Sequence, residues 1–258
     1  ARIQFALLKF KIRVIRDYSV MDERTLKILL ASVRDFIDTG VPVSSKELYE
    51  AHDFGIKPAS IRGELLRLTD AGYLDQPHIS GGRVPTEEGY EFFVNRLIAD
   101  MFGKTLGGLV SLRDSLLEEL LHRRTDEAVS ELSDELGTLA IGYESDSGSF
   151  YKSGFEELCS QLDLNRREEF LEIVHDFESL NDRVEKFAGS LKSGESPQVY
   201  IGKKSPITQS PHLAVIADSY VIDGEPMLLI AVGPKRMDYK KPLKIFKAIR
   251  EEFKNKKE

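Results

Sequence analysis

Residues 57–86 contain the side chains most suited to bind another molecule. This stretch is typical of one helix followed at once by a hairpin. Pro58 suits the first helical position, where its missing N–H costs nothing, and Gly72 suits the left-handed residue that closes a helix. Apolar residues three and four positions apart predict the buried stripe of this helix. That stripe consists of Ile61, Leu65 and Leu68.

Small and cationic residues are left on the faces turned away from the stripe: Ala59, Ser60, Arg62, Gly63 and Arg67. Small side chains let a helix approach the major groove of DNA closely, and an arginine there can bind guanine through two hydrogen bonds. A solvated face on an ordinary helix has a similar composition. The helix alone therefore leaves DNA reading and simple solvent exposure as alternatives.

The segment after this helix is typical of a hairpin. A strand begins near Leu74, Ser80 opens a turn with two glycines, and the chain returns to Thr86, which caps another helix. The tip carries His78, Ser80 and Arg83, and such a tip can lie along a phosphate backbone or place an arginine in the minor groove. A lone histidine is more often a surface residue than a ligand, and no paired Cys and His spacing accompanies His78. We therefore expect no metal site.

Two further helices are predicted before residue 57. Residues 22–39 show a helical apolar period with acids in the first turn and Gly40 at the end. Ser44, with Glu47 three residues later, forms a capping box for a second helix. Gly55 then suits a tight turn. Helix, turn, helix and hairpin in this order predict a winged helix-turn-helix.

Composition limits the class of protein. The chain has 258 residues, 41% of them hydrophobic and 31% charged, which is typical of a globular protein with room for two domains. No run of about 18 apolar residues exists, so we expect no membrane span. The single cysteine, Cys159, excludes an intramolecular disulfide, favours a cytoplasmic setting and is expected to be a small buried hydrophobe.

The charge is unusual for a protein that binds nucleic acid, because the formal net charge is −7. Residues 1–100 carry 14 Lys and Arg against 15 Asp and Glu, whereas residues 101–258 carry 22 against 28. Most of the acidic excess lies outside the helix and hairpin, which leaves room for a local basic face.

Catalysis is not indicated by any motif. The carboxylates are scattered over expected helix faces, and no Gly-rich phosphate loop follows a strand. We therefore expect no enzyme activity, no catalytic residues and no cofactor. Residues 233–239 form a loop that suits either a small ligand or a structural staple.

Residues 1–20 alternate apolar and basic residues between Leu8 and Arg16, a strand period whose charge resembles a targeting or nucleic-acid arm. The chain begins at Ala1, and Met21 opens the first well-formed helix. We expect residues 1–20 to be an extension upstream of a natural start at Met21, with no function.

Beyond the hairpin the pattern is mainly helical, with a wide leucine stripe that suits either a core or an interface. The stripe consists of Leu106, Leu109, Val110, Leu116, Leu117, Leu120 and Leu121, and the pattern repeats in Ala128, Val129, Leu132, Leu136 and Leu139. One amphipathic helix is predicted over residues 169–191. Strands are predicted over residues 199–201, 212–221 and 227–232, with a turn at Asp223-Gly224, and a last helix over residues 241–253.

Two groups of short motifs stand out. The first group is Thr39-Gly40-Val41-Pro42-Val43-Ser44-Ser45-Lys46, Ser60-Ile61-Arg62, Gly72-Tyr73-Leu74, Gln76-Pro77-His78 and Gly82-Arg83-Val84-Pro85-Thr86 with Gly89-Tyr90. The second is Val199-Tyr200-Ile201-Gly202 and Gly233-Pro234-Lys235-Arg236-Met237-Asp238-Tyr239. Through these motifs the chain resembles the HrcA family of bacterial heat-inducible transcription repressors.

The resemblance implies a repressor of chaperone genes that binds an inverted repeat called CIRCE as a dimer and is kept active by the chaperonin GroEL. It also implies a GAF-like second domain with an inserted helical dimerising segment. The chain departs from the family pattern at Gly63, at Ile79 and at Lys203 with Lys204, so we expect its base preference to have drifted. Its second domain is short, and we expect its sheet to be small.

These patterns together predict an α+β protein with an N-terminal extension (1–20), a winged helix-turn-helix DNA-binding domain (21–98) and a helical, reduced GAF-like dimerisation or regulatory domain (99–258) with a small antiparallel sheet. The expected DNA-binding residues are Ser44, Ser45, Lys46, Lys57, Ala59, Ser60, Arg62, Gly63, Arg67, His78, Ser80 and Arg83. The predicted function is repression by a homodimer on double-stranded DNA. The alternative is a ligand-sensing or protein-binding regulator whose winged helix serves as an interaction module.

Overall fold

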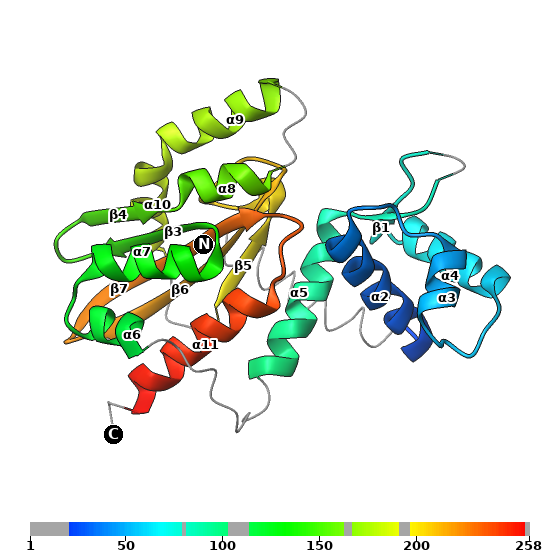
Figure 1. The fold of residues 1–258 in the computed structure, drawn as a ribbon, viewed down its shortest axis with the longest axis horizontal. Helices are drawn as coiled ribbons and strands as arrows, with labels where there is room; N and C mark the ends of the chain where they lie inside the picture. The colour runs from blue at the N-terminus through cyan, green and yellow to red at the C-terminus, as the bar shows by residue number, and fades with distance from the viewer. Residues whose placement is uncertain (1–20, 79–80, 103–113, 163–166, 191–196, 256–258) are drawn as a thin grey trace. The chain divides into compact units, whose positions relative to one another are not determined.

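The computed structural model describes residues 21–78, 81–102, 114–162, 167–190 and 197–255 (Figure 1). They belong to two compact units that divide between Asn95 and Arg96. The expectations for residues 1–20, for the turn residue Ser80 and for the first part of the leucine stripe lie outside the described residues.

The described residues of the first unit form three helices, a short antiparallel hairpin and the beginning of a fourth helix (Figure 1). Its elements are α2 (Glu23–Thr39), α3 (Ser45–Ala51), α4 (Pro58–Asp70), β1 (Leu74–Asp75), β2 (Val84–Pro85) and α5 (Glu87–Phe102). The division between the two units falls within α5.

Local signals set the ends of these helices as the sequence predicts. Asp22 caps α2, and Gly40 closes it in the left-handed region with φ 71°. Ser44 and Glu47 form the predicted capping box of α3. The hydroxyl of Thr86 accepts a hydrogen bond from the Gly89 backbone N–H at 3.1 Å, at the start of α5.

The core of the first unit joins α2, α3 and α4 to the hairpin and to α5. Its fully buried side chains include Ile28, Leu29, Leu48, Ile61, Leu68, Leu74, Tyr90 and Phe92. The Tyr73 ring meets the Phe92 ring edge to face, with centroids 5.4 Å apart. This shared core holds the hairpin and α4 in one rigid arrangement.

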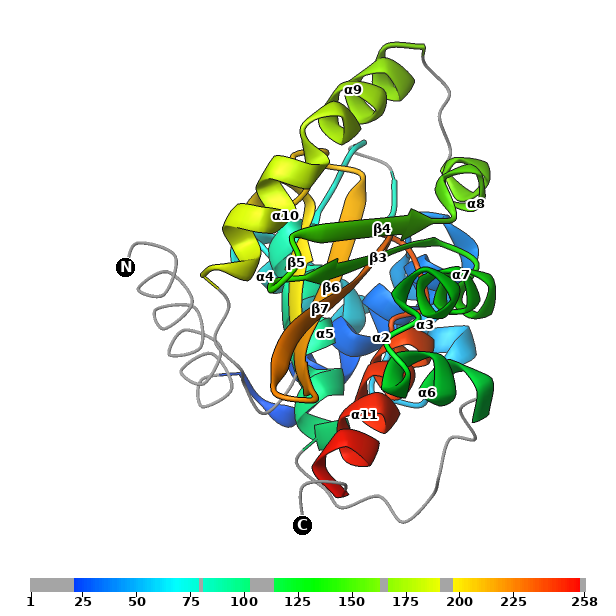
Figure 2. The ribbon, with the colours of Figure 1, turned by 90° about the vertical axis from the view of Figure 1, so that its left-hand side faces the viewer.

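The second unit is a five-stranded antiparallel sheet with helices around it (Figure 2). Its elements are α6 (Asp114–Leu121), α7 (Thr125–Leu136), β3 (Leu139–Glu144), β4 (Ser149–Ser153), α8 (Phe155–Gln161), α9 (Arg167–Glu178), α10 (Leu180–Ala188), β5 (Gln198–Ile201), a 3-10 turn η1 (Gly202–Lys204), β6 (Leu213–Ile222), β7 (Glu225–Pro234) and α11 (Lys240–Asn255). The strand order is β4-β3-β7-β6-β5.

Both faces of this sheet are covered, which explains why β3, β6 and β7 are apolar almost throughout. Alternate residues of these strands, such as Ile141, Val215 and Ile230, join one core with Leu158 of α8 and Val184 of α10. The opposite face packs against α7 and α11. The mixed α+β class predicted from the sequence is therefore confirmed.

A buried ion pair joins the sheet to the last helix. Asp218 on β6 accepts hydrogen bonds from the Arg250 guanidinium of α11, with Nε 3.1 Å from Oδ2. Burial raises the pKa of the Asp218 carboxyl, against the lowering effect of Arg250. The pair therefore fixes how α11 lies on the sheet, because either charge alone would be costly to bury there.

Two turns agree with the sequence. Asp223 and Gly224 both take positive φ between β6 and β7, as the hairpin prediction requires. In the loop before α11, the hydroxyl of Tyr239 donates to the Lys235 carbonyl at 2.6 Å, which favours the structural staple over a ligand loop.

Three expectations about the second unit were wrong. Leu139 belongs to β3, because Gly137 ends α7 in the left-handed region. Residues 149–153, for which the sequence predicts no element, form the edge strand β4. The helix expected over residues 169–191 is two helices, because Ser179 leaves helical dihedral angles and lets α10 bring Val184 onto the sheet.

Gly154 provides a test of this packing, because it has φ 90° and an added Cβ would overlap the Thr138 carbonyl oxygen and the Ser133 hydroxyl. We expect Gly154→Ala to lower the free energy of unfolding by roughly 3 kcal/mol, measured by urea denaturation. The matched control is Gly148→Ala, which has φ 69° but open space around its Cβ and should cost only about 1 kcal/mol. Equal effects of the two substitutions would contradict the close approach at Gly154.

Candidate nucleic-acid interface

Helix α4 is half buried and half exposed, in the pattern that its sequence predicts. Ile61, Leu65 and Leu68 are 0%, 4% and 1% exposed. The outward positions are all exposed, namely Ala59, Ser60, Arg62, Gly63 and Arg67. In the part of the chain that the structure describes, the guanidinium of Arg62 makes no hydrogen bond or ion pair.

The beginning of α4 differs from the beginnings of α2 and α3. Side chains of Asp22 and Ser44 accept hydrogen bonds from the first turns of α2 and α3. Helix α4 has no side-chain cap and no acidic residue in its first turn, and Lys57 occupies its N-cap position. Pro58 has no N–H, and the N–H groups of Ser60 and Ile61 donate to the Lys57 carbonyl. The positive end of the helix dipole, next to Lys57, is therefore the feature that suits an anion such as phosphate.

The local charge follows the same pattern. Residues 21–95 carry 8 Lys and Arg against 13 Asp and Glu, so this part of the first unit has an acidic excess. Residues 54–63 nevertheless contain Lys57 and Arg62 and no acidic residue. The beginning of α4 thus carries two basic side chains with no acidic residue close in sequence, which suits the approach of a phosphate backbone.

A buried carboxylate fixes α4 against α2. Glu64 of α4 is 7% exposed, and its Oε2 accepts a hydrogen bond from the Thr25 hydroxyl of α2 at 2.8 Å. The other oxygen, Oε1, lies 3.3 Å from Nη2 of Arg67. The Thr25 backbone N–H, which donates to Asp22 Oδ1 at 2.9 Å, also holds the pKa of the Asp22 carboxyl below its usual value. Thr25 therefore connects Asp22, the N-terminal cap of α2, with Glu64 of α4.

The base of the hairpin is tied to α4 and to the chain before α3. Nε of Arg83 donates to the Thr69 hydroxyl at 2.9 Å, and Arg83 pairs with Val43 through two backbone hydrogen bonds of 2.8 Å. A Cβ added to Gly82 would lie 2.5 Å from the Pro42 carbonyl oxygen, so only glycine fits there. Arg83 therefore lies at the base of the hairpin and not at the tip as expected, because these contacts join residues far apart in the sequence.

The remaining predicted residues lie in different surroundings. Lys46 is exposed and lies 3.9 Å from Glu50, and His78 is exposed near the tip. Ser44 uses its hydroxyl as the α3 cap, while Ser45 is only 9% exposed, so its side chain is withdrawn from the surface. Ser80 lies outside the described residues.

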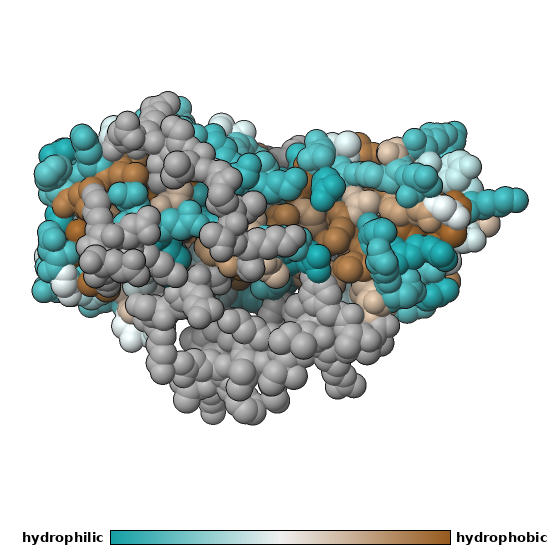
Figure 3. Space-filling view, turned by 90° about the horizontal axis from the view of Figure 1, so that it is seen from below, coloured by the Kyte–Doolittle hydropathy of each residue, from teal (hydrophilic) through white to brown (hydrophobic). Residues whose placement is uncertain are grey.

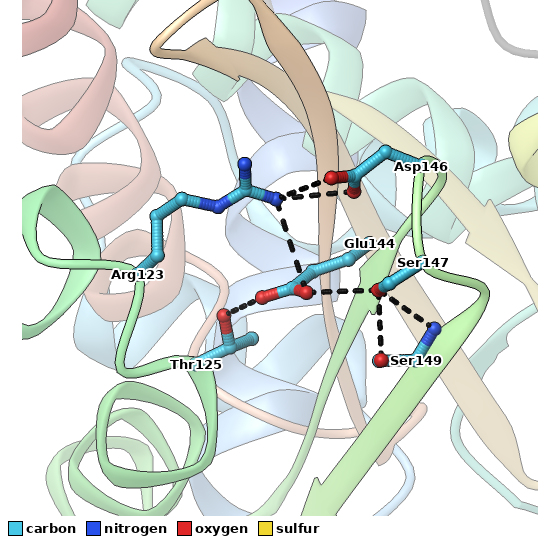
Figure 4. Close-up of polar contacts among 6 residues, drawn as sticks. All are labelled: Arg123, Thr125, Glu144, Asp146, Ser147 and Ser149. Carbon is cyan, nitrogen blue, oxygen red and sulfur yellow. Dashed lines mark hydrogen bonds and ion pairs between the residues drawn. The ribbon is translucent and has the colours of Figure 1, made fainter.

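A second polar cluster lies in the second unit, between the α6–α7 turn and the β3–β4 turn (Figure 4). Nη2 of Arg123 lies 3.0 Å from both carboxylate oxygens of Asp146 and 3.9 Å from Glu144 Oε2. The hydroxyl of Ser147 lies 3.0 Å from the same Glu144 oxygen, and Thr125 donates to the other one. The hydrogen bond with Asp146 raises the pKa of the Arg123 guanidinium. The carboxylates of Glu144 and Asp146 and the Arg123 guanidinium are thus paired with one another, which is typical of contacts that stabilise the fold.

The described residues contain no group of three or more His, Cys, Asp or Glu side chains placed to hold a metal ion. Within the same residues, no helix is long and apolar enough to cross a membrane. Cys159 is partly exposed on α8 and not fully buried as expected, because it lies on the outer side of a short surface helix, and burial still raises the pKa of its thiol.

The described architecture is that of a two-part α+β protein, with a helical unit that carries a hairpin and a unit built on an antiparallel sheet. Residues 67–242 match the family model described as HrcA protein C terminal domain, and the chain belongs to the HrcA family.

The heat-inducible transcription repressor HrcA of Thermobifida fusca (strain YX) is 49% identical over 81 residues, which cover 31% of this chain and 24% of that protein. The repressor of the same name from Beutenbergia cavernae is 45% identical over 108 residues, which cover 42% of this chain and 28% of that protein. The matched segments thus span about a quarter of the length of these relatives.

A solved crystal structure described as a hypothetical protein shares the fold. It aligns with a TM-score of 0.71 and 17% sequence identity, over 91% of this chain and 98% of that chain. At this identity the likeness extends to the fold alone.

Thr25 offers a test of how α4 is held. We expect Thr25→Val to lower the free energy of unfolding by about 1 to 3 kcal/mol, because the buried Glu64 carboxylate loses its hydroxyl donor while the side-chain volume is kept. The control is Thr39→Val at the exposed end of α2, which should cost less than about 1 kcal/mol. Denaturant titration of both variants measures the difference, and a Thr25→Val variant as stable as the parent would refute the tie.

Proposed function

We propose that residues 21–98 form a winged helix-turn-helix that binds double-stranded DNA, with α4 as the reading helix and the β1–β2 hairpin as the wing. The chain then acts as a transcription repressor that blocks a promoter. The observation that carries this proposal is the beginning of α4, which is exposed, basic and without a side-chain cap.

Each outward residue of α4 has a role that its chemistry suits. Arg62 is free to reach a base edge in the major groove, and Ser60 can bind phosphate or a base. Ala59 and Gly63 let the helix backbone approach the groove, since an added Cβ at Gly63 would meet nothing in the free protein. Lys57 and Arg67 are placed for phosphate, and Lys46, His78 and Arg83 extend this surface.

The names of the relatives support the same function, because both are described as heat-inducible transcription repressors. We therefore propose heat-shock or chaperone genes as the target, and an inverted repeat of the CIRCE type as the operator. A chaperonin co-repressor, as the family resemblance implies, stays a prediction for this chain.

An inverted repeat requires a two-fold partner, so we propose a homodimer held through residues beyond about 100. Much of the leucine pattern there is used inside the unit, since Leu116, Leu120, Ala128, Val129 and Leu132 are all at most 2% exposed. Apolar surface is available instead at Phe155, Phe170 and Leu171, which are 38%, 40% and 46% exposed. Figure 3 shows the molecule from below, the side away from α8 and α9 in Figure 1, and hydrophobic patches lie between hydrophilic residues there.

The test is fluorescence anisotropy of the full chain on a labelled inverted repeat and on a shuffled duplex, at several salt concentrations. Repression predicts a preference for the repeat and a steep loss of affinity with salt, with a log-log slope of about 0.9 for each neutralised phosphate. A winged helix that serves only as a protein interaction module would show neither property, and that result would overturn the proposal.

Arg62→Ala tests the reading role of α4. We expect it to cost about 1 to 3 kcal/mol on the preferred duplex and much less on the shuffled one, because a base contact discriminates between sequences. Arg34→Ala, at an exposed arginine of α2, is the matched control and should leave the ratio of the two affinities unchanged. If Arg62→Ala weakened both duplexes equally, Arg62 would not read bases.

Arg83→Ala tests the wing. We expect it to weaken binding to both duplexes similarly and to lower the salt slope by about one unit, because wing contacts are mainly to phosphates. Thr69→Val removes the hydroxyl that accepts a hydrogen bond from Arg83 but leaves the positive charge of Arg83 in place. The salt slope of this variant should therefore be unchanged. A loss confined to one sequence after Arg83→Ala would instead assign direct base reading to the wing.

A further inference from the structure

Leu66 is a large apolar side chain that α4 exposes to solvent. It is 52% exposed, whereas Leu65, the residue before it in the same helix, is 4% exposed. Leucine loses stabilisation when it is left in water, since burying such a side chain is favourable. Leu66 therefore offers apolar surface on the helix that is proposed to read DNA.

The position of Leu66 on α4 is fixed by the buried stripe of that helix. At 3.6 residues per turn, Leu66 lies on the same outward line as Ala59 and Gly63, and Arg62 lies one turn before it. Side chains on a helix lean toward its N-terminus, so we expect Leu66 to lean over the turn of Arg62 and Gly63. A Cβ added at Gly63 would meet nothing within 4 Å, so that side of Leu66 is open.

The neighbours of Leu66 favour a nucleic acid over a protein as the molecule that covers it. Helix α4 is described in full, and its other exposed residues are Ala59, Ser60, Arg62, Gly63, Arg67 and Asp70. The core of a protein interface joins several large apolar side chains, and this helix face carries one. The major groove instead presents single apolar groups, the thymine 5-methyl groups, among polar base edges and phosphates.

The charges along α4 limit how far DNA can follow the helix. Lys57 and Arg62 precede Leu66 and attract phosphates, whereas the exposed carboxylate of Asp70 follows one turn later and repels them. The contact with DNA is therefore expected to end in the turn that carries Leu66.

We propose that Leu66 packs against the 5-methyl group of a thymine in the major groove and so helps to set the base preference of the chain. This inference rests on the proposed function, in which α4 is the reading helix. A helix rises 1.5 Å per residue, so Leu66 lies about 6 Å along the axis from Arg62, which equals roughly two base steps. The thymine should therefore lie within about two base pairs of the base that Arg62 contacts.

Replacement of thymine by uracil tests this contact, because it removes the 5-methyl group and keeps base pairing. Thymines of one half-site of the labelled inverted repeat are replaced one at a time, and fluorescence anisotropy measures the affinity of the full chain. We expect one replacement to weaken binding of the parent chain by about fourfold, the effect of one buried methyl group. The same replacement should not affect Leu66→Ala, in which α4 keeps a strong helix former.

The control is Val41→Ala, at an exposed valine that precedes α3, which should keep the uracil effect of the parent chain. A uracil effect that persists in Leu66→Ala, or no uracil effect at any thymine, would overturn the contact and leave Leu66 as a surface residue or a contact for another protein. Equal affinity of the parent chain for the repeat and the shuffled duplex would overturn the proposed function, and this inference with it.

Discussion

The packing of α4 on α2 is the constraint on which the first unit depends. Ile61, Leu65 and Leu68 turn one side of α4 inward, and the hydrogen bond between Thr25 and Glu64 sets the rotation of the helix about its axis. Because this rotation is fixed, Ser60 and Arg62 must face outward. The same helix holds the β1–β2 hairpin through Thr69 and Arg83. A preorganised surface of this kind loses little conformational entropy when it binds.

The second unit is held by a different constraint, the burial of both faces of its sheet. Helices α8 and α10 cover one face, and α7 and α11 cover the other. The apolar residues of α7 are consumed by this packing, as Gly142 shows, since an added Cβ there would lie 2.7 Å from Val129. Among the described residues of the second unit, large apolar side chains remain exposed on α8 and α9.

Sequence reasoning succeeded where the signal is local. Caps, closing glycines and apolar stripes involve residues a few positions apart, so α2, α3, α4 and the turn at Asp223-Gly224 could be predicted. The outward face of α4 follows directly from the same periodicity. The central residues of the candidate interface, Ser60 and Arg62, are therefore predictable from the sequence alone.

Sequence reasoning failed where contacts join distant residues. The edge strand β4 is short and only partly buried, so its alternation is weak. The break at Ser179 has no proline or glycine to mark it, and the bonds from Asp176 to Gln209 and Ser210 span more than thirty positions. Ser45 was expected at the interface because of its motif, yet the helix start that it shares with Ser44 places its side chain inside.

The central proposal for this chain is that it reads DNA as a two-fold assembly through α4. A DNase footprint on a promoter that contains an inverted repeat upstream of a chaperonin gene measures this most directly. We expect protection of both half-sites, centred a whole number of helical turns apart, at protein concentrations that leave the flanking sequence unprotected. Uniform protection of the whole fragment, or none at any concentration, would contradict it.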